Sequence, residues 1–188
     1  WVLGGDRPLL TSRHFAIINA MAAGLKEGDE GRHLMTFHPT GGHSSSYHVH
    51  DEEWLDFNMI QSGHGKVNNE NYKMITDDYD RLPVKPTFDA EPCYEDHPIG
   101  FKAENGYFDA ADVRRAAYWA VFAGGMGHTY GHHCIWSMNT EPVPYFIMDW
   151  KTALLRPGAK QMVYLRSLME SRSFLDRVPD QSLIAENY

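Results

Sequence analysis

The sequence contains little of what defines several large classes of protein. Its two cysteines, Cys93 and Cys134, are too few for a disulfide framework and are not spaced for a metal site. No run reaches the roughly 18 apolar residues that a membrane span needs, and no signal peptide is recognisable. Repeats and low-complexity tracts are absent. A globular domain is the class that remains.

Charge and composition narrow this class further. A net charge of −8 argues against a surface that binds duplex nucleic acid, which requires clustered lysine and arginine. The 188 residues, 43% of them hydrophobic, are enough for one domain with an ordinary core. Five tryptophans and ten tyrosines suit a sugar-binding cleft, in which rings serve as flat apolar platforms, but they suit an ordinary core equally well.

Strand-like and helix-like segments alternate along the chain. Short apolar segments predict strands at residues 1–3, 33–37, 54–60, 84–90 and 127–131, the last continuing loosely to Trp136. Amphipathic periodicity predicts helices from Thr11 or Ser12 to about Lys26 and over 69–79, 109–123 and 158–171, with Asp109 as the N-cap of the third. The expected inward stripes are Phe15, Ile18, Met21, Ala22 and Leu25; Val113, Ala116, Ala117, Ala120 and Val121; and Met162, Leu165, Leu168 and Met169. This alternation predicts parallel β-α-β units.

Polar residues gather at one end of the predicted strands. They are Asp6, His38, Gln61, His64, Glu91 and Tyr130. Because the C-terminal ends of parallel strands meet on one face, the bias indicates an α/β barrel, and no glycine-rich phosphate loop points to a nucleotide-binding sheet. A closed barrel needs eight strands and typically about 250 residues. The chain has fewer strands and opens inside one without an initiator methionine, so we expect the first three units to be absent.

Glu91 stands at the end of the fourth predicted strand. Counted alternately, Thr87, Asp89 and Glu91 share a face, and Pro92 removes the next ladder donor. A glutamate in this position projects into the mouth of a barrel; the alternative is a strand-end glutamate paired with an arginine or lysine. Glu95 competes for the same role, but it lies in a loop, and sites on rigid elements hold their geometry better.

Asp6 is placed in the same way after the first strand. The Gly4-Gly5 pair allows the backbone to turn sharply and to approach a ligand. The alternative role of Asp6 is to cap the following helix, although Thr11 or Ser12 would cap it better. Asp56 lies early in its strand, near the stability-associated face of a barrel, which favours a structural role. Asp6 and Glu91 follow strands that are far apart in the sequence, and a pair of such acids is the minimum that cleavage of a glycosidic bond requires.

The eleven histidines raise the hypothesis of a metal site. However, His48 and His50 precede a strand, and the adjacent His132-His133 pair would point to opposite faces of a strand. HExxH and Cys-x-x-Cys patterns are absent. We therefore predict no metal and no cofactor. His38 and His64, which directly follow strands, are interpreted as hydrogen-bonding groups for a sugar or for the carboxylates.

Other chemical groups have weaker support or two interpretations. Gly-x-Ser-x-Gly is absent, which argues against a hydrolase elbow, and no position pairs Cys93 with a histidine. Tyr94, Tyr130 and Trp136 either stack on a sugar ring or line the interior around the last strand.

Several motifs together resemble one family. They are Gly4-Gly5-Asp6, Thr36-Phe37-His38-Pro39, Trp54-Leu55-Asp56-Phe57-Asn58-Met59-Ile60-Gln61-Ser62-Gly63-His64, Glu91-Pro92-Cys93-Tyr94-Glu95, Gly127-His128-Thr129-Tyr130-Gly131 and Ile135-Trp136. In this order they are similar to the apiosidase-like glycoside hydrolases of bacteria. That family has a (β/α)₈ barrel, often followed by a small β-rich domain, and acts on plant cell-wall polysaccharides.

The resemblance implies an α/β fold of the TIM (β/α)₈ barrel type, to which residues 1–188 contribute about strands four to eight and their helices. Asp6 matches the acid/base position and Glu91 the nucleophile, whereas Cys93 stands where an arginine is expected. The residues implied in substrate binding are His38, Gln61, His64, Tyr94, Glu95, Tyr130 and Trp136. The run 178–184 would lead into a C-terminal domain, and family members are commonly exported.

The resulting prediction is a retaining glycoside hydrolase that uses Asp6 and Glu91 on a plant-type polysaccharide or oligosaccharide. Carbohydrate is the expected partner; nucleic acid and membrane are not expected. Two alternatives stay open. One is a catalytically incomplete barrel that binds carbohydrate, or that a preceding segment or another chain completes. The other is a metal-dependent barrel hydrolase.

Overall fold

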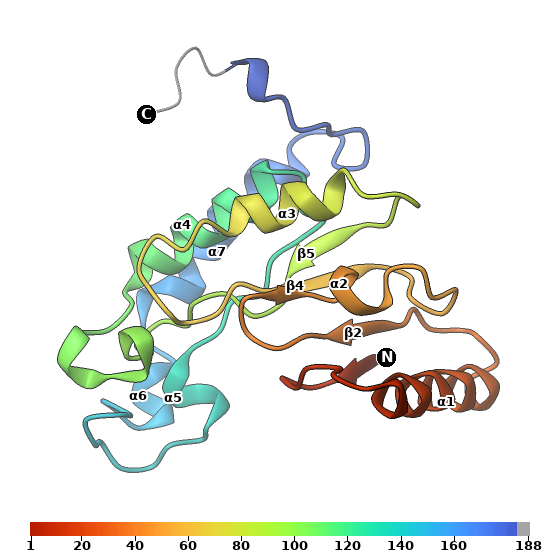
Figure 1. Ribbon diagram of the computed structural model, residues 1–188. Helices are drawn as coiled ribbons and strands as arrows, with labels where there is room; N and C mark the ends of the chain where they lie inside the picture. The colour runs from red at the N-terminus through yellow and green to blue at the C-terminus, as the bar shows by residue number, and fades with distance from the viewer. Residues whose placement is uncertain (184–188) are drawn as a thin grey trace.

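The computed structural model describes residues 1–183 and shows a mixed α/β chain (Figure 1). Its strands are β1 (Val2–Gly4), β2 (Thr36–His38), β3 (His43–Ser44), β4 (Asn58–Gln61) and β5 (Thr87–Asp89). Its α-helices are α1 (Ser12–Gly28), α2 (Ser46–Val49), α3 (Asn71–Tyr79), α4 (Ala110–Phe122), α5 (His133–Trp136), α6 (Trp150–Ala153) and α7 (Pro157–Glu170), and 3₁₀ turns occupy Ile99–Phe101, Ala103–Asn105 and Gln181–Leu183. None of the helices described here has the length and apolar character needed to cross a membrane.

The strands form two parallel pairs that lie next to each other. β1 pairs with β2, with Leu3 opposite Phe37, and β4 pairs with β5 in the same parallel sense. The two pairs are connected where the Asp56 N–H donates to the Met35 carbonyl at 2.9 Å. β3, which the sequence pattern does not predict, is antiparallel to β4. The C-terminal ends of the parallel strands therefore reach a common edge, as expected for part of a barrel.

The last predicted strand is much shorter than expected. It is reduced to a single parallel bridge between Asp89 of β5 and His128. The predicted continuation toward Trp136 is wrong, because His132 caps a helical turn. Its Nδ1 atom accepts a hydrogen bond from the Cys134 N–H at 3.1 Å, which starts α5.

The first helix begins where the sequence predicts. Thr11 caps it, since the Thr11 hydroxyl accepts a hydrogen bond from the His14 N–H at 3.3 Å. Ile18 and Ala22 are buried against the strands, but Met21 is 47% exposed. The inward prediction for Met21 is wrong because it lies roughly 100° around the helix from Ala22, outside the buried stripe.

The later helices follow the predicted pattern closely. Asp109 caps α4 in a reciprocal capping box with Asp112, and all five residues of the predicted inward stripe are buried. In α7, Leu165 is buried as predicted, whereas Leu168 is 45% exposed. Of the run 178–184 that follows α7, Ile184 lies outside the described residues.

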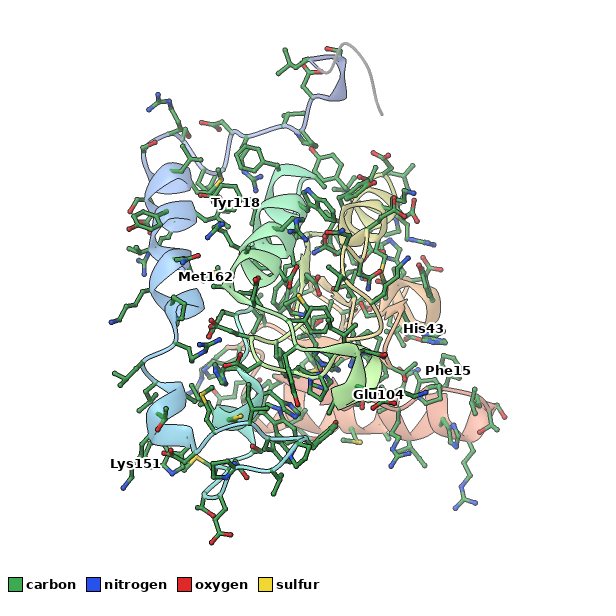
Figure 2. The ribbon with its side chains drawn as sticks, turned by 90° about the vertical axis from the view of Figure 1, so that its left-hand side faces the viewer. Phe15, His43, Glu104, Tyr118, Lys151 and Met162 are labelled. Atoms are coloured by element: carbon green, nitrogen blue, oxygen red, sulfur yellow. The ribbon has the colours of Figure 1, made fainter. Side chains whose placement is uncertain are left out.

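The helices cover the strands on two sides. Figure 1 shows α3, α4 and α7 together on one side and α1 beside β1 and β2 on the other. The core contains Leu3, Ile18 and Phe37 between α1 and the strands, Ile60, Ile75 and Ala120 where β4 meets α3 and α4, and Ala117, Val121 and Leu165 between α4 and α7. Tyr118 of α4 and Met162 of α7 pack against the last group and lie close together in Figure 2. This packing leaves the C-terminal ends of the strands open.

Candidate active site

A cleft of about 1050 Å³ opens at the edge where the parallel strands end. Its lining includes six residues that the sequence predicts for the site, Asp6, Gln61, His64, Glu91, Tyr94 and Trp136. They belong to β4, to the segments that follow β1, β4 and β5, and to α5. The fold therefore brings together side chains that are far apart in the sequence.

Glu91 is held by two histidines, one on each carboxylate oxygen. His38 Nε2 lies 3.1 Å from Oε2, and His64 Nε2 lies 3.2 Å from Oε1. The Glu91 side chain is 20% exposed, so the carboxylate can be reached from the cleft. Within residues 1–183 its ion-pair partners are these imidazoles rather than an arginine or lysine.

The hydrogen bonds of His38 indicate how the pair is charged. Its Nδ1 atom lies 3.0 Å from the Pro39 carbonyl, which only accepts, so Nδ1 carries a proton. The hydrogen bond to Glu91 raises the pKa of His38 against the opposing effect of burial. Burial by itself would raise the pKa of Glu91, but hydrogen bonds from His38 and His64 outweigh it and lower this pKa to about 2. The carboxylate is therefore ionised at neutral pH.

Asp6 lines the same cleft. Its backbone is in the left-handed region, with φ of 59°, and its side chain is exposed. Gly4 allows the preceding strand to pack tightly, because a Cβ atom there would lie 2.6 Å from the His38 carbonyl oxygen. Since Thr11 caps α1, Asp6 is not used as the cap of that helix. The negative charge of Asp6 contributes to the raised pKa of His38.

Gln61, Tyr94 and Trp136 line the cleft in different ways. Gln61 is 4% exposed, and its Oε1 atom has no partner among the described residues. Burial raises the pKa of Tyr94, and the charge of Glu91 adds to this effect. The Tyr94 ring packs on Gly131, where a Cβ atom would lie 2.1 Å from the ring. Trp136 is 61% exposed, so its ring is free to contact a ligand.

Glu95 and Tyr130 lie outside the lining of the cleft. Glu95 is fully buried and accepts hydrogen bonds from the Tyr130 hydroxyl at 2.6 Å and from the Gly158 N–H at 3.0 Å. Next to it, Asp96 pairs with Arg156 at 2.7 Å. These contacts attach the segment after β5 to the start of α7. The position of Glu95 and Tyr130 supports a structural role and does not support the predicted contact with substrate.

Asp89 lies beneath Glu91 on β5 and is fully buried. It accepts hydrogen bonds from the Ser62 hydroxyl at 2.6 Å and from the Asn71 side-chain amide at 2.9 Å. Burial raises the pKa of Asp89 to about 6, although these hydrogen bonds act in the opposite direction. Because Ser62 follows β4 and Asn71 begins α3, Asp89 connects the elements that hold the cleft.

Three residues with ring side chains line the cleft and are not found by the sequence analysis. They are His97, Phe101 and Tyr145. His97 stacks on His64, with ring centroids 4.1 Å apart, and burial lowers its pKa to about 3. Phe101 ends a three-residue 3₁₀ turn, and the other two lie in connections between helices and strands, so periodicity carries no signal for any of them. The one sequence feature that points to any of them is the polar run from Glu91 to His97, which indicates that His97 belongs near the site.

Two of the histidines considered for a metal site instead make separate hydrogen bonds to different partners. His50 Nε2 lies 2.9 Å from the Pro83 carbonyl, and His132 Nε2 lies 3.1 Å from Asp96 Oδ2. Within residues 1–183, no group of three or more His, Cys, Asp and Glu side chains is arranged to hold a metal ion.

Comparison with known proteins gives matches over nearly the whole chain. A family model described as apiosidase-like, catalytic domain, matches residues 1–176. A solved structure described as a glycoside hydrolase is 38% identical, with a TM-score of 0.92 over 100% of this chain and 46% of its own. The crystal structure of a glycoside hydrolase family 5 from Bacteroides vulgatus ATCC 8482 is 39% identical, with a TM-score of 0.90 over 100% of this chain and 43% of its own. None of the curated proteins matches. The chain spans less than half the length of these two structures.

Proposed function

Because this chain belongs to the apiosidase-like catalytic-domain family, we propose that it carries the catalytic carboxylate pair of a glycoside hydrolase, with Glu91 as the nucleophile and Asp6 as the general acid and base. The observation that carries the proposal is the double histidine contact of Glu91 at the cleft. A nucleophilic carboxylate must be ionised and reachable, and Glu91 combines a pKa of about 2 with partial exposure.

In the first step, Glu91 attacks the anomeric carbon of the sugar while Asp6 donates a proton to the leaving oxygen. The glycosidic C–O bond breaks, and an ester between the sugar and Glu91 forms. In the second step, Asp6 removes a proton from water, the water oxygen attacks the same carbon, and Glu91 leaves as a carboxylate. The sugar therefore keeps its anomeric configuration.

The two histidines support both steps of this reaction. Donors on both carboxylate oxygens stabilise Glu91 when it is charged, before the attack and after the ester is hydrolysed. They also orient the carboxylate relative to the cleft. The same contacts lower the basicity of Glu91, which makes it a better leaving group in the second step.

We further propose that β1, β2, β4 and β5 correspond to strands four to seven of a (β/α)₈ barrel and that the bridge at His128 marks the eighth. The order of these elements and the placement of Asp6 and Glu91 after two of them support this correspondence. The remaining strands would come from a preceding segment or from another chain. A plant cell-wall polysaccharide is the proposed substrate and an exported location the proposed compartment, both on the family resemblance alone.

The test is the release of reducing sugar from soluble plant cell-wall polysaccharides, followed by NMR of the anomer first formed. We expect release with retention, and we expect the Glu91→Gln variant to lose activity by roughly 10³-fold or more. Glu27→Gln, a change at an exposed glutamate of α1, a helix with no residue in the lining of the cleft, is the matched control. A first product with the inverted anomeric configuration would contradict the assignment of Glu91 as the nucleophile. Binding of the polysaccharide without release of reducing sugar would favour a carbohydrate-binding role.

A further inference from the structure

Three exposed aromatic rings stand together along the cleft. They are Phe101, Trp136 and Tyr145, which are 58%, 61% and 37% exposed, respectively, and which we call the aromatic wall. They come from three different segments: the 3₁₀ turn Ile99–Phe101, α5, and the connection that follows α5. Because large apolar side chains gain little stability while exposed, their convergence on one cleft calls for a ligand that covers them.

The aromatic wall rests on two buried histidines. The Phe101 ring meets His97 edge-on at 4.9 Å, and the Tyr145 ring meets His133 at 4.8 Å. The indole N–H of Trp136 donates to His133 Nδ1 at 3.4 Å. Burial lowers the pKa of His97 to about 3 and that of His133 to about 4. The support of the wall is therefore uncharged at neutral pH.

Phe101 is held in an unfavourable backbone conformation. Its φ is 65°, in the left-handed region that bulky residues rarely adopt. The turn is anchored, since the Gly100 N–H donates to the His64 carbonyl at 2.9 Å and the Phe101 N–H donates to the Pro98 carbonyl at 3.0 Å. Strain combined with an exposed ring does not serve stability, and such positions are concentrated at ligand-binding sites.

The wall lies next to the proposed nucleophile. The Phe101 ring centroid is 5.9 Å from that of His64, and His64 contacts Glu91. Flat aromatic faces bind the C–H faces of sugar rings, while the polar groups of the cleft bind hydroxyls. We propose that the aromatic wall is a binding subsite for a sugar ring next to the one attacked at Glu91, with Phe101 as its main platform. This inference rests on the proposed function and specifies a substrate of at least two sugar residues.

The test measures binding without turnover. Affinity gel electrophoresis of the purified Glu91→Gln protein is performed with pectin, xylan and arabinogalactan as probes. We expect at least one of them to retard migration, and we expect Phe101→Gly added to Glu91→Gln to weaken this binding roughly two- to tenfold. Phe101→Trp should retain binding. Phe122→Ala, which removes a 51% exposed phenylalanine of α4, is the matched control and should leave binding unchanged.

Thermal unfolding separates a binding role from a structural one. Phe101→Gly relieves the positive-φ strain but loses the ring contacts with His97 and His64, so its Tm should stay close to that of its parent. Unchanged binding in Phe101→Gly, or no retardation of the parent by any probe, would overturn the proposal. If the glycine variant does not fold, Phe101→Leu, which lacks the flat ring, is measured in its place with the same outcomes. If the native protein releases no sugar from these polysaccharides but the binding of Glu91→Gln still depends on Phe101, the proposed hydrolase activity is rejected and the proposed subsite is retained.

Discussion

His38 and Glu91 form an ion pair in which Nε2 lies 3.1 Å from Oε2. The imidazole stands at the end of β2, and the carboxylate follows β5. The pair therefore joins the two parallel halves of the strand system at the cleft. Because Nδ1–H donates to the Pro39 carbonyl, Nε2 can also donate to the carboxylate only when His38 is the protonated imidazolium, so the pair consists of a cation and an anion.

The stabilising effect of this pair should decrease both at acidic pH, where Glu91 is protonated, and at higher pH, where His38 loses its proton. The pKa of Glu91 is lowered from 4.5, so its contribution is present above pH 4.5 and is lost as the pH falls toward 2. The pKa of His38 is raised from 6.5, so its contribution is present below pH 6.5 and is lost as the pH rises through the folded-state value. We expect the difference in unfolding free energy between the native protein and Glu91→Gln to be largest between pH 4.5 and 6.5. Urea unfolding across this range measures it, and a difference independent of pH would contradict the ion pair.

Removing one donor from Glu91 should move the acidic limit of activity. His64→Phe keeps a ring against His97 and Tyr94 but deletes the hydrogen bond to Oε1. A hydrogen bond to a charged group contributes about 1.5–3 kcal/mol, so the pKa of Glu91 should rise and the acidic limb of kcat/KM should move up by about one pH unit or more. His14→Phe, on the exposed face of α1, is the control. An unmoved acidic limb would mean that another group sets it.

The role of Asp6 can be separated from that of Glu91 by varying the leaving group. Asp6→Asn should lower kcat/KM by roughly 10²–10⁴-fold on a polysaccharide, whose leaving oxygen needs a proton. For a dinitrophenyl glycoside, whose leaving group departs without one, the glycosylation step should be nearly unaffected. Asp77→Asn, an exposed change in α3, provides the baseline. Equal losses on both substrates would assign Asp6 to binding or folding.

Tyr130→Phe tests the structural interpretation of the Glu95 contacts. The variant removes one donor from a fully buried carboxylate, which should cost about 1–3 kcal/mol of unfolding free energy. The KM of the folded Tyr130→Phe protein should equal that of the native protein. Tyr164→Phe, at an exposed tyrosine of α7, is the control. A raised KM with unchanged stability would instead restore the substrate contact that the sequence predicts for Tyr130.

The longer helices could be predicted from local signals. The stripe of α4 and its Asp109 cap are encoded within adjacent turns, and the structure confirms both. The short elements could not be predicted, because β3, α2 and α5 contain few residues each. Their existence depends on partners elsewhere in the chain, such as β4 for β3. The family indicated by the motifs is confirmed. It could be predicted because the identity and order of motifs are read directly from the sequence, whatever local structure lies between them.

The sequence by itself determined that acids follow the first and fourth predicted strands and that a histidine follows the second. Strand periodicity is local, so these positions can be counted along the chain. Only the tertiary structure decided which polar groups meet. It placed His38 and His64 on the two oxygens of Glu91 and buried Glu95, four residues away, beneath Tyr130 and Gly158. The physical reason is that burial and ion pairing arise from contacts between distant segments, which no local pattern contains.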